Sequence, residues 1–160
     1  MILLSEIHKL RGRRYGDMTG RQVILTNRPF TLEELHDFMK EHWNEEEAGG
    51  FVVGRPTAAS IEEYILLPAT PRFMTIVYPR RAGGFLTKEN KVILSTADTP
   101  SGAMEGLFQA VPTGGRILAG ITKMASLSSS EKERKGPAEE ILLRYTEYMK
   151  KLLGEAGYLK

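Results

Sequence analysis

The sequence predicts an α/β (α+β) protein with a single mixed, mostly antiparallel sheet, one parallel βαβ unit and helices packed on the sheet faces. Two observations predict this class. Short β-rich runs follow one another over residues 51–96, separated by gaps too short for crossover helices, which favours an antiparallel meander. Residues 91–121 then show the order of a βαβ unit: strand, capped helix, Gly-Gly turn and second strand over residues 116–121.

The first elements are a predicted strand over residues 22–26 and a helix that begins at Thr31. Thr31 as N-cap and Glu34 three residues later make a capping box, which marks the clearest helix start in the chain. The glycine pair at 49–50 is expected to end this helical region before the strands of the meander begin.

The last predicted helix begins near Pro137 and ends before Gly157. Its apolar residues recur at helical spacing and predict a face that packs on the sheet: Ile141, Leu142, Tyr145, Tyr148, Met149, Leu152, Leu153 and Ala156. The serine-rich, charged stretch 124–137 before it is expected to be a flexible loop. It lies within a single globular domain spanning residues 1–160.

Composition excludes several classes of function. The chain has no cysteine, and therefore no disulfide, thiolate nucleophile or cysteine-ligated zinc. Its net charge of +2 argues neither for nor against nucleic acid, and without a dense basic tract no clear nucleic-acid partner is predicted. Arginines such as Arg80–Arg81 could meet an acidic partner or RNA, but they lack interleaved exposed aromatics and are interpreted as solvated surface. Its histidines lack metal-ligand spacing, and no metal site is predicted. Without an apolar run of membrane-spanning length, the expected location is the cytoplasm, with no membrane partner.

The strongest candidate for a ligand site is the turn at residues 99–102. Thr99 is a good N-cap, and the unpaired amides of the first turn behind it would attract phosphate or carboxylate. Ser101 adds a hydroxyl donor, and Gly102 allows a ligand to approach the backbone closely. The alternative is that Thr99 and Asp98 satisfy these amides themselves, with no ligand.

A candidate proton donor lies on the last helix. Tyr148 would act as a general acid if its hydroxyl reached a cleft, and the alternative is that it packs in the core with Tyr145. The cofactor is not identified, but a coenzyme A-like or other phosphate-bearing ligand fits the predicted anion site.

Three segments in order resemble the Gcn5-related acyltransferase fold: VILTNRPFTLEELHDFMKEH, KVILSTADTPSGAMEGLFQAV and LLRYTEYMKKLLGEAGY. They correspond to the opening strand and helix, the cofactor-binding β-turn-α unit and the closing helix. The resemblance implies that the second segment binds the cofactor pyrophosphate. The family's Arg/Gln-x-x-Gly-x-Gly/Ala signature is not present in this segment.

Two further resemblances are to other folds. VPTGGRILAG and LLGEAGY resemble the back half of Rossmann-type methyltransferases. Residues 47–54 fit the E-x-x-G-x-x-x-G pattern of the Mov34/JAB fold, and LAGITKMASLSSSE falls where that family has its zinc-binding histidines. Because these histidines are missing, this resemblance implies a degenerate, metal-free domain.

Two functions follow from the sequence as hypotheses. The first is a small-molecule transferase-like protein that binds an anionic cofactor or substrate at residues 99–102. The second is a non-catalytic binding or assembly module that meets another copy of itself or another protein, to which the degenerate Mov34/JAB-like domain would belong.

Overall fold

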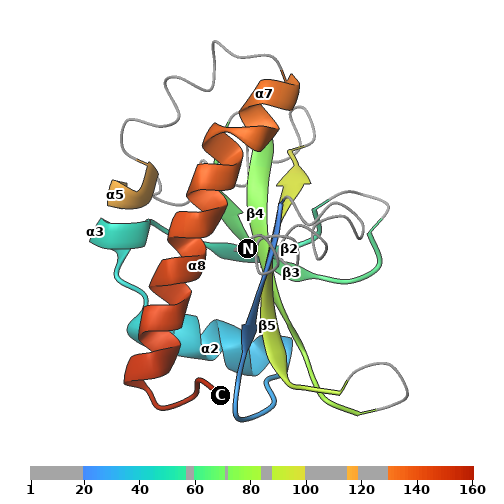
Figure 1. Cartoon of the computed structure of the whole chain (residues 1–160), viewed down its shortest axis with the longest axis vertical. Coiled ribbons are helices and arrows are strands. Elements are labelled where there is room, and N and C mark those ends of the chain that lie inside the picture. The colour runs from blue at the N-terminus through green and yellow to red at the C-terminus, as the bar shows by residue number, and fades with distance from the viewer. Residues whose placement is uncertain (1–19, 57–59, 71, 84–87, 100–114, 119–129) are drawn as a thin grey trace, which may run out of the picture.

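A five-stranded antiparallel sheet forms the centre of the structure, in the order β1-β5-β4-β3-β2 (Figure 1). The computed structural model describes residues 20–56, 60–70, 72–83, 88–99, 115–118 and 130–160. The strands are β1 (Arg21–Leu25), β2 (Val52–Gly54), β3 (Tyr64–Pro68), β4 (Phe73–Arg80) and β5 (Lys91–Asp98). Strands β2 to β5 pair with their neighbours in sequence, which confirms the predicted meander, and β1 adds antiparallel to β5.

The predicted parallel βαβ unit is wrong. Every strand pairing within the described residues is antiparallel, and residues 116–118, expected to start the second parallel strand, belong to the short helix α5 (Gly115–Leu118). Ile117 and Leu118 are buried in the core as part of one helical turn. A short apolar run suits a buried helical turn as well as a strand, which explains the error. The predicted helix that would connect these elements, in residues 100–114, lies outside the described residues.

Helix α2 (Leu32–His42) begins as the sequence predicts. The Thr31 hydroxyl accepts from the Glu34 amide at 3.0 Å, and the Glu34 carboxylate accepts from the Thr31 amide at 3.0 Å. Asn44 caps the short helix α3 (Glu45–Ala48) by accepting from the Glu46 amide at 2.8 Å. Both helix starts therefore have their first amides partly satisfied by side chains.

Part of the predicted loop 124–137 is helical. Residues 130–135 form α7 (Ser130–Lys135), and α8 (Pro137–Glu155) follows it, while residues 124–129 lie outside the described residues. The carboxylate of Glu133 is fully buried and accepts from the amide of Arg72 at 3.1 Å and from its guanidinium at 2.8 Å. This contact joins α7 to the start of β4. The serine-rich, charged composition of the segment gives no sign of such a contact.

Helices α2 and α8 pack on the same face of the sheet (Figure 1). The main core lies between them and the sheet, and includes Leu35, Met39, Tyr145 and Met149 from the helices. The last helix confirms the prediction: it starts at Pro137, and Gly157 follows its end with φ +81°. No helix in the described part of the chain is both long and apolar enough to cross a membrane.

Candidate functional site

The anion site predicted at residues 99–102 is described only at Thr99, because Ser101 and Gly102 lie outside the described residues. The Thr99 amide donates to the Arg72 carbonyl oxygen at 2.8 Å, which extends the pairing of β4 and β5. The Thr99 hydroxyl is buried and has no hydrogen-bond partner. The Thr99 hydroxyl is therefore not exposed to a ligand in this structure, and anion binding at residues 99–102 stays a prediction.

Tyr148 connects α8 to the junction of α2 and α3. Its hydroxyl accepts from the Asn44 amide at 2.9 Å, and its ring contacts Trp43 edge to face with centroids 4.9 Å apart. The side chain is half-buried, and its predicted role as a general acid is not tested by these contacts. In the structure it holds the start of α3 in place.

The two predicted site residues that the structure describes, Thr99 and Tyr148, lie in different parts of the molecule. Thr99 is bonded to Arg72, which is fixed to α7 through Glu133. Tyr148 lies on α8 well past Pro137, about 16 Å further along the helix axis at the usual rise per residue. The structure does not bring Thr99 and Tyr148 together into one site.

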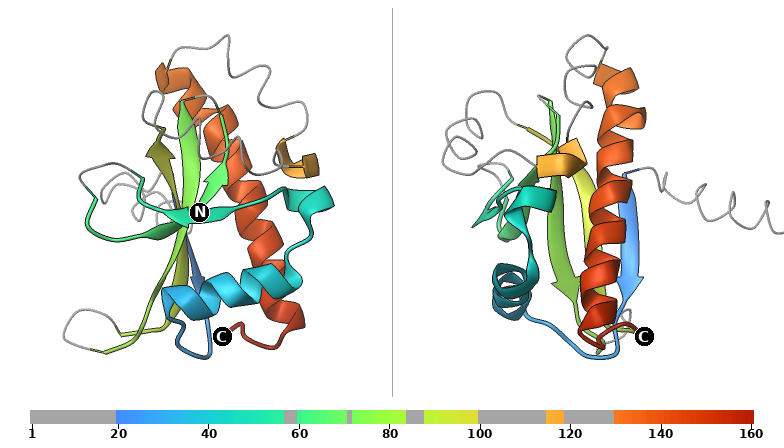
Figure 2. Two further views of the ribbon diagram at one scale, coloured as in Figure 1. Left: turned by 180° about the vertical axis from the view of Figure 1, so that it is seen from behind. Right: turned by 90° about the vertical axis from the view of Figure 1, so that its left-hand side faces the viewer.

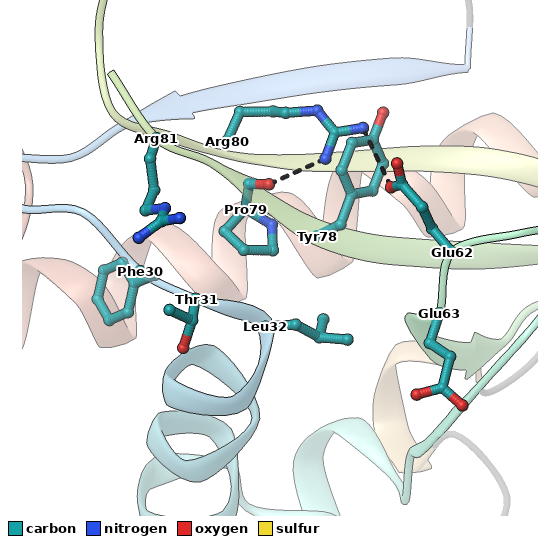
Figure 3. A pocket seen from close by; sticks show the side chains of 9 residues that line it. All are labelled: Phe30, Thr31, Leu32, Glu62, Glu63, Tyr78, Pro79, Arg80 and Arg81. Atoms are coloured by element: carbon teal, nitrogen blue, oxygen red, sulfur yellow. Dashed lines mark hydrogen bonds and ion pairs between the residues drawn. The ribbon is translucent and has the colours of Figure 1, made fainter. Parts of the chain in front are cut away.

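A different hollow, of about 310 Å³, lies where α2 begins beside the end of β4 (Figure 3). We call it the α2 pocket. It is formed by three segments far apart in the sequence: the start of α2, the residues just before β3, and the end of β4 with the residue that follows. Its lining residues are Phe30, Thr31, Leu32, Glu62, Glu63, Tyr78, Pro79, Arg80 and Arg81.

Arg80 is held on one wall of the α2 pocket. Its guanidinium lies 3.6 Å from the Glu62 carboxylate and 4.5 Å from the centre of the Tyr78 ring, and it donates to the Pro79 carbonyl oxygen at 3.2 Å. These contacts occupy both Arg80 and Glu62. The charge that a ligand meets in the pocket therefore comes mainly from its two other charged residues, Arg81 and Glu63.

Arg81 and Glu63 are the unpaired charges of the α2 pocket. Neither has an ion pair or hydrogen bond within the described ranges of the chain. Arg81 extends toward Phe30 at one end of the pocket, and Glu63 lies at the other end, with Leu32 and Pro79 between them (Figure 3). The pocket is therefore positive at one end, negative at the other and partly apolar in the middle.

The start of α2 adds partial positive charge to the pocket. The amides of Leu32 and Glu33 belong to the first turn of this 11-residue helix, where backbone amides have no partner within the helix. They carry the partial positive charge of a helix N-terminus. The capping box uses only the amides of Thr31 and Glu34, so the two amides between them stay open to a ligand.

Arg81 also borders a second hollow of about 520 Å³, lined by Pro29, Arg81, Ala82, Gly83 and Asn90. The Asn90 side chain accepts from the Ala82 amide at 2.7 Å, which fixes the backbone next to Arg81. Arg81 therefore borders two hollows from a backbone segment that is held in position.

Two of the three segments that form the α2 pocket are recognisable in the sequence, but not the contact between them. The capping box at Thr31 was predicted as a helix start, and Arg80–Arg81 as solvated surface. The available signal was an arginine pair that directly follows a β-rich run. Only the packing of α2 near the end of β4 brings that pair to the start of the helix.

No set of three metal-ligating side chains occurs in the part of the chain that the structure describes. Comparison with protein-family models, with curated proteins and with solved structures finds no match to this chain.

Proposed function

We propose that this protein is a small-molecule-binding module whose α2 pocket takes a dipolar ligand. The anionic group of the ligand, a carboxylate or phosphate, binds Arg81, and an amino group binds Glu63. The proposal rests on the Arg81 guanidinium, which has no partner among the described residues although it lines a hollow of about 310 Å³.

The positive end of the pocket suits an oxyanion. A guanidinium presents its donors in a fixed fork that matches the two oxygens of a carboxylate or phosphate. Leu32 lines the pocket, and its amide, which has no partner within the helix, supplies a further donor. Because Glu62 is already paired with Arg80, the charge that an incoming anion meets first is that of Arg81.

The other end suits an amino group. Glu63 is exposed and has no cation beside it in the described part of the chain, so a ligand ammonium would gain an ion pair there. Leu32 and Pro79 provide an apolar surface for a short carbon linker between the two groups of the ligand. The pocket is small enough to favour ligands of few atoms.

The transferase-like activity suggested by the sequence is kept as a separate hypothesis. It requires a phosphate-bearing cofactor such as coenzyme A at residues 99–102, of which Thr99 lies beside Arg72, at the end of β4 opposite the α2 pocket. A substitution in the α2 pocket should abolish binding there and leave binding at Thr99 intact, which distinguishes the two hypotheses.

The proposal is tested by thermal unfolding with three matched probes: phosphoethanolamine, inorganic phosphate and ethanolamine. A ligand that binds only the folded state raises the melting temperature by mass action. We expect the largest rise with phosphoethanolamine, a smaller one with phosphate and the smallest with ethanolamine. Coenzyme A serves as the probe of the separate hypothesis.

Three variants locate the site. Arg81→Gln should weaken phosphoethanolamine binding by about tenfold or more, since a charge-assisted hydrogen bond is lost. Glu63→Gln should reduce phosphoethanolamine binding to the level of phosphate alone. Arg55→Gln is the control, because Arg55 is also exposed, lies outside the pocket and loses the same charge. Equal responses of the Arg81 and Arg55 variants, or no shift with any of the three probes, would refute the proposal.

A further inference from the structure

A third hollow, of about 480 Å³, runs along the exposed side of α8. We call it the α8 groove. Helices α3 and α5 lie beside α8 there (Figure 2). The Arg144 guanidinium joins α8 to α5 by donating to the Ile117 carbonyl oxygen at 3.3 Å. The groove is lined by Glu47, Arg116, Ile117, Glu140, Leu143, Arg144, Glu147, Tyr148 and Lys151.

Four charged residues of the groove form one stripe on α8. Glu140, Arg144, Glu147 and Lys151 follow at spacings of four, three and four residues, which places them on the same helix face. Their charges alternate from negative to positive along the stripe. Reversing the direction of the helix therefore exchanges every negative position for a positive one.

Two apolar side chains flank this stripe. Leu143 is exposed, with 43% of its surface accessible. Tyr148 lies on the other flank and is half-buried, with its ring packed on Trp43. A partner helix laid along the stripe would remove Leu143 from water.

We propose that the α8 groove binds a second copy of this chain, with the two α8 helices antiparallel about a two-fold axis. In this register Glu140 faces Lys151 of the second copy, and Arg144 faces Glu147 of the second copy. Each of these pairs occurs twice, because a two-fold interface uses the same surface patch on both subunits.

The charge pattern favours a second copy of this chain as the partner and an antiparallel arrangement of the two α8 helices. A parallel arrangement in register would place every charge of the stripe against the same charge, which is unfavourable. In the antiparallel register described above, all four charged positions meet opposite charges. Such self-complementarity is a property that a surface needs for a symmetric dimer.

Contacts within one chain limit the strength of this association. Arg144 already lies 2.6 Å from the Glu140 carboxylate, and Glu147 lies 3.5 Å from Lys150. Lys151 has no ion pair within the described residues, so its contact with Glu140 of the second copy is the main new ion pair. The dimer is therefore weak and weakens further with salt.

Sedimentation equilibrium at low and high salt, at concentrations up to about 1 mM, measures this association. Lys151→Glu should weaken the dimer by about tenfold, because two attractive pairs become repulsive. The double variant Glu140→Lys with Lys151→Glu restores opposite charges and should recover much of the loss. Lys88→Glu is the control, since Lys88 is an exposed lysine outside the groove.

Three results would overturn the proposal. The first is a monomer at every concentration in low salt. The second is a dimer that Lys151→Glu and Lys88→Glu weaken equally, which would place the interface elsewhere. The third is a double variant that dimerises no more tightly than Lys151→Glu alone. This would mean that Glu140 and Lys151 of the two copies do not face each other. Ligand binding in the α2 pocket is unaffected by any of these results.

Discussion

The Tyr145 hydroxyl donates a hydrogen bond of 2.7 Å to the Pro68 carbonyl oxygen, which joins the middle of α8 to the end of β3. The Tyr145 side chain has no exposed surface, and burial raises the pKa of its hydroxyl above the ordinary value. The hydroxyl therefore remains a protonated donor at neutral pH. This single bond satisfies a sheet carbonyl with a side chain from the helix that covers it.

Replacing Tyr145 by phenylalanine should lower the free energy of unfolding by about 1–3 kcal/mol, because the Pro68 carbonyl loses its partner in a buried site. Urea unfolding followed by the fluorescence of the single tryptophan, Trp43, measures this change. Tyr148→Phe is the matched control, since its hydroxyl is only half-buried and its removal should cost less. A Tyr145→Phe variant as stable as the wild type would contradict this account of the helix–sheet contact.

Gly115 allows α5 to pack directly on α3. Its φ is +60°, and a Cβ at this position would lie 2.7 Å from the Glu46 carbonyl oxygen. Gly157 has a similar φ of +81° but open space around the same position. Gly115→Ala should therefore destabilise the protein by at least about 1 kcal/mol more than Gly157→Ala, because only the first adds a clash to the backbone strain. Equal losses in thermal unfolding would mean that α5 does not pack as described.

His36 should make stability depend on pH. Burial, and then the nearby positive charge of Lys40, lower the pKa of His36 below its ordinary value of 6.5, and its ring lies edge to face with Phe51 at 5.5 Å. The unfolded chain therefore binds the proton more readily, so stability falls as the pH drops below about 6.5 toward the folded-state pKa. Above pH 6.5 the imidazole is mostly neutral in both states, and this contribution is constant.

Comparing urea unfolding at several pH values between neutral and mildly acidic isolates this effect. In His36→Gln, the part of the pH dependence that arises from this imidazole should disappear, leaving a smaller loss on acidification. An unchanged pH profile in the variant would mean that the ring is not desolvated as described.

Local signals predicted much of this fold. The capping box of Thr31 and Glu34 marked a helix start correctly, since that motif depends only on residues three apart. The short gaps between strands correctly predicted an antiparallel meander, because such gaps are too short to hold a crossover helix. Ile117 and Leu118 were misassigned because two adjacent apolar residues carry no period that separates a helical turn from a strand.

The candidate site was harder to predict, because it depends on contacts between distant segments. Arg81 and Glu63 have no common motif, and they line one pocket only because β4 pairs with β3 and α2 packs near the end of β4. The same is true of Glu133, which looked like part of a solvated charged loop until its contact with Arg72 placed it in the interior. Sequence spacing says little about such relationships.

The central claim, that the α2 pocket is the ligand site, is tested most directly by an NMR titration of the ¹⁵N-labelled protein with phosphoethanolamine. We expect the amide signals of Leu32, Glu33 and Arg81 to shift together and to saturate with one dissociation constant, while that of Thr99 stays in place. A titration that shifts Thr99 and leaves Leu32, Glu33 and Arg81 unchanged would contradict the account.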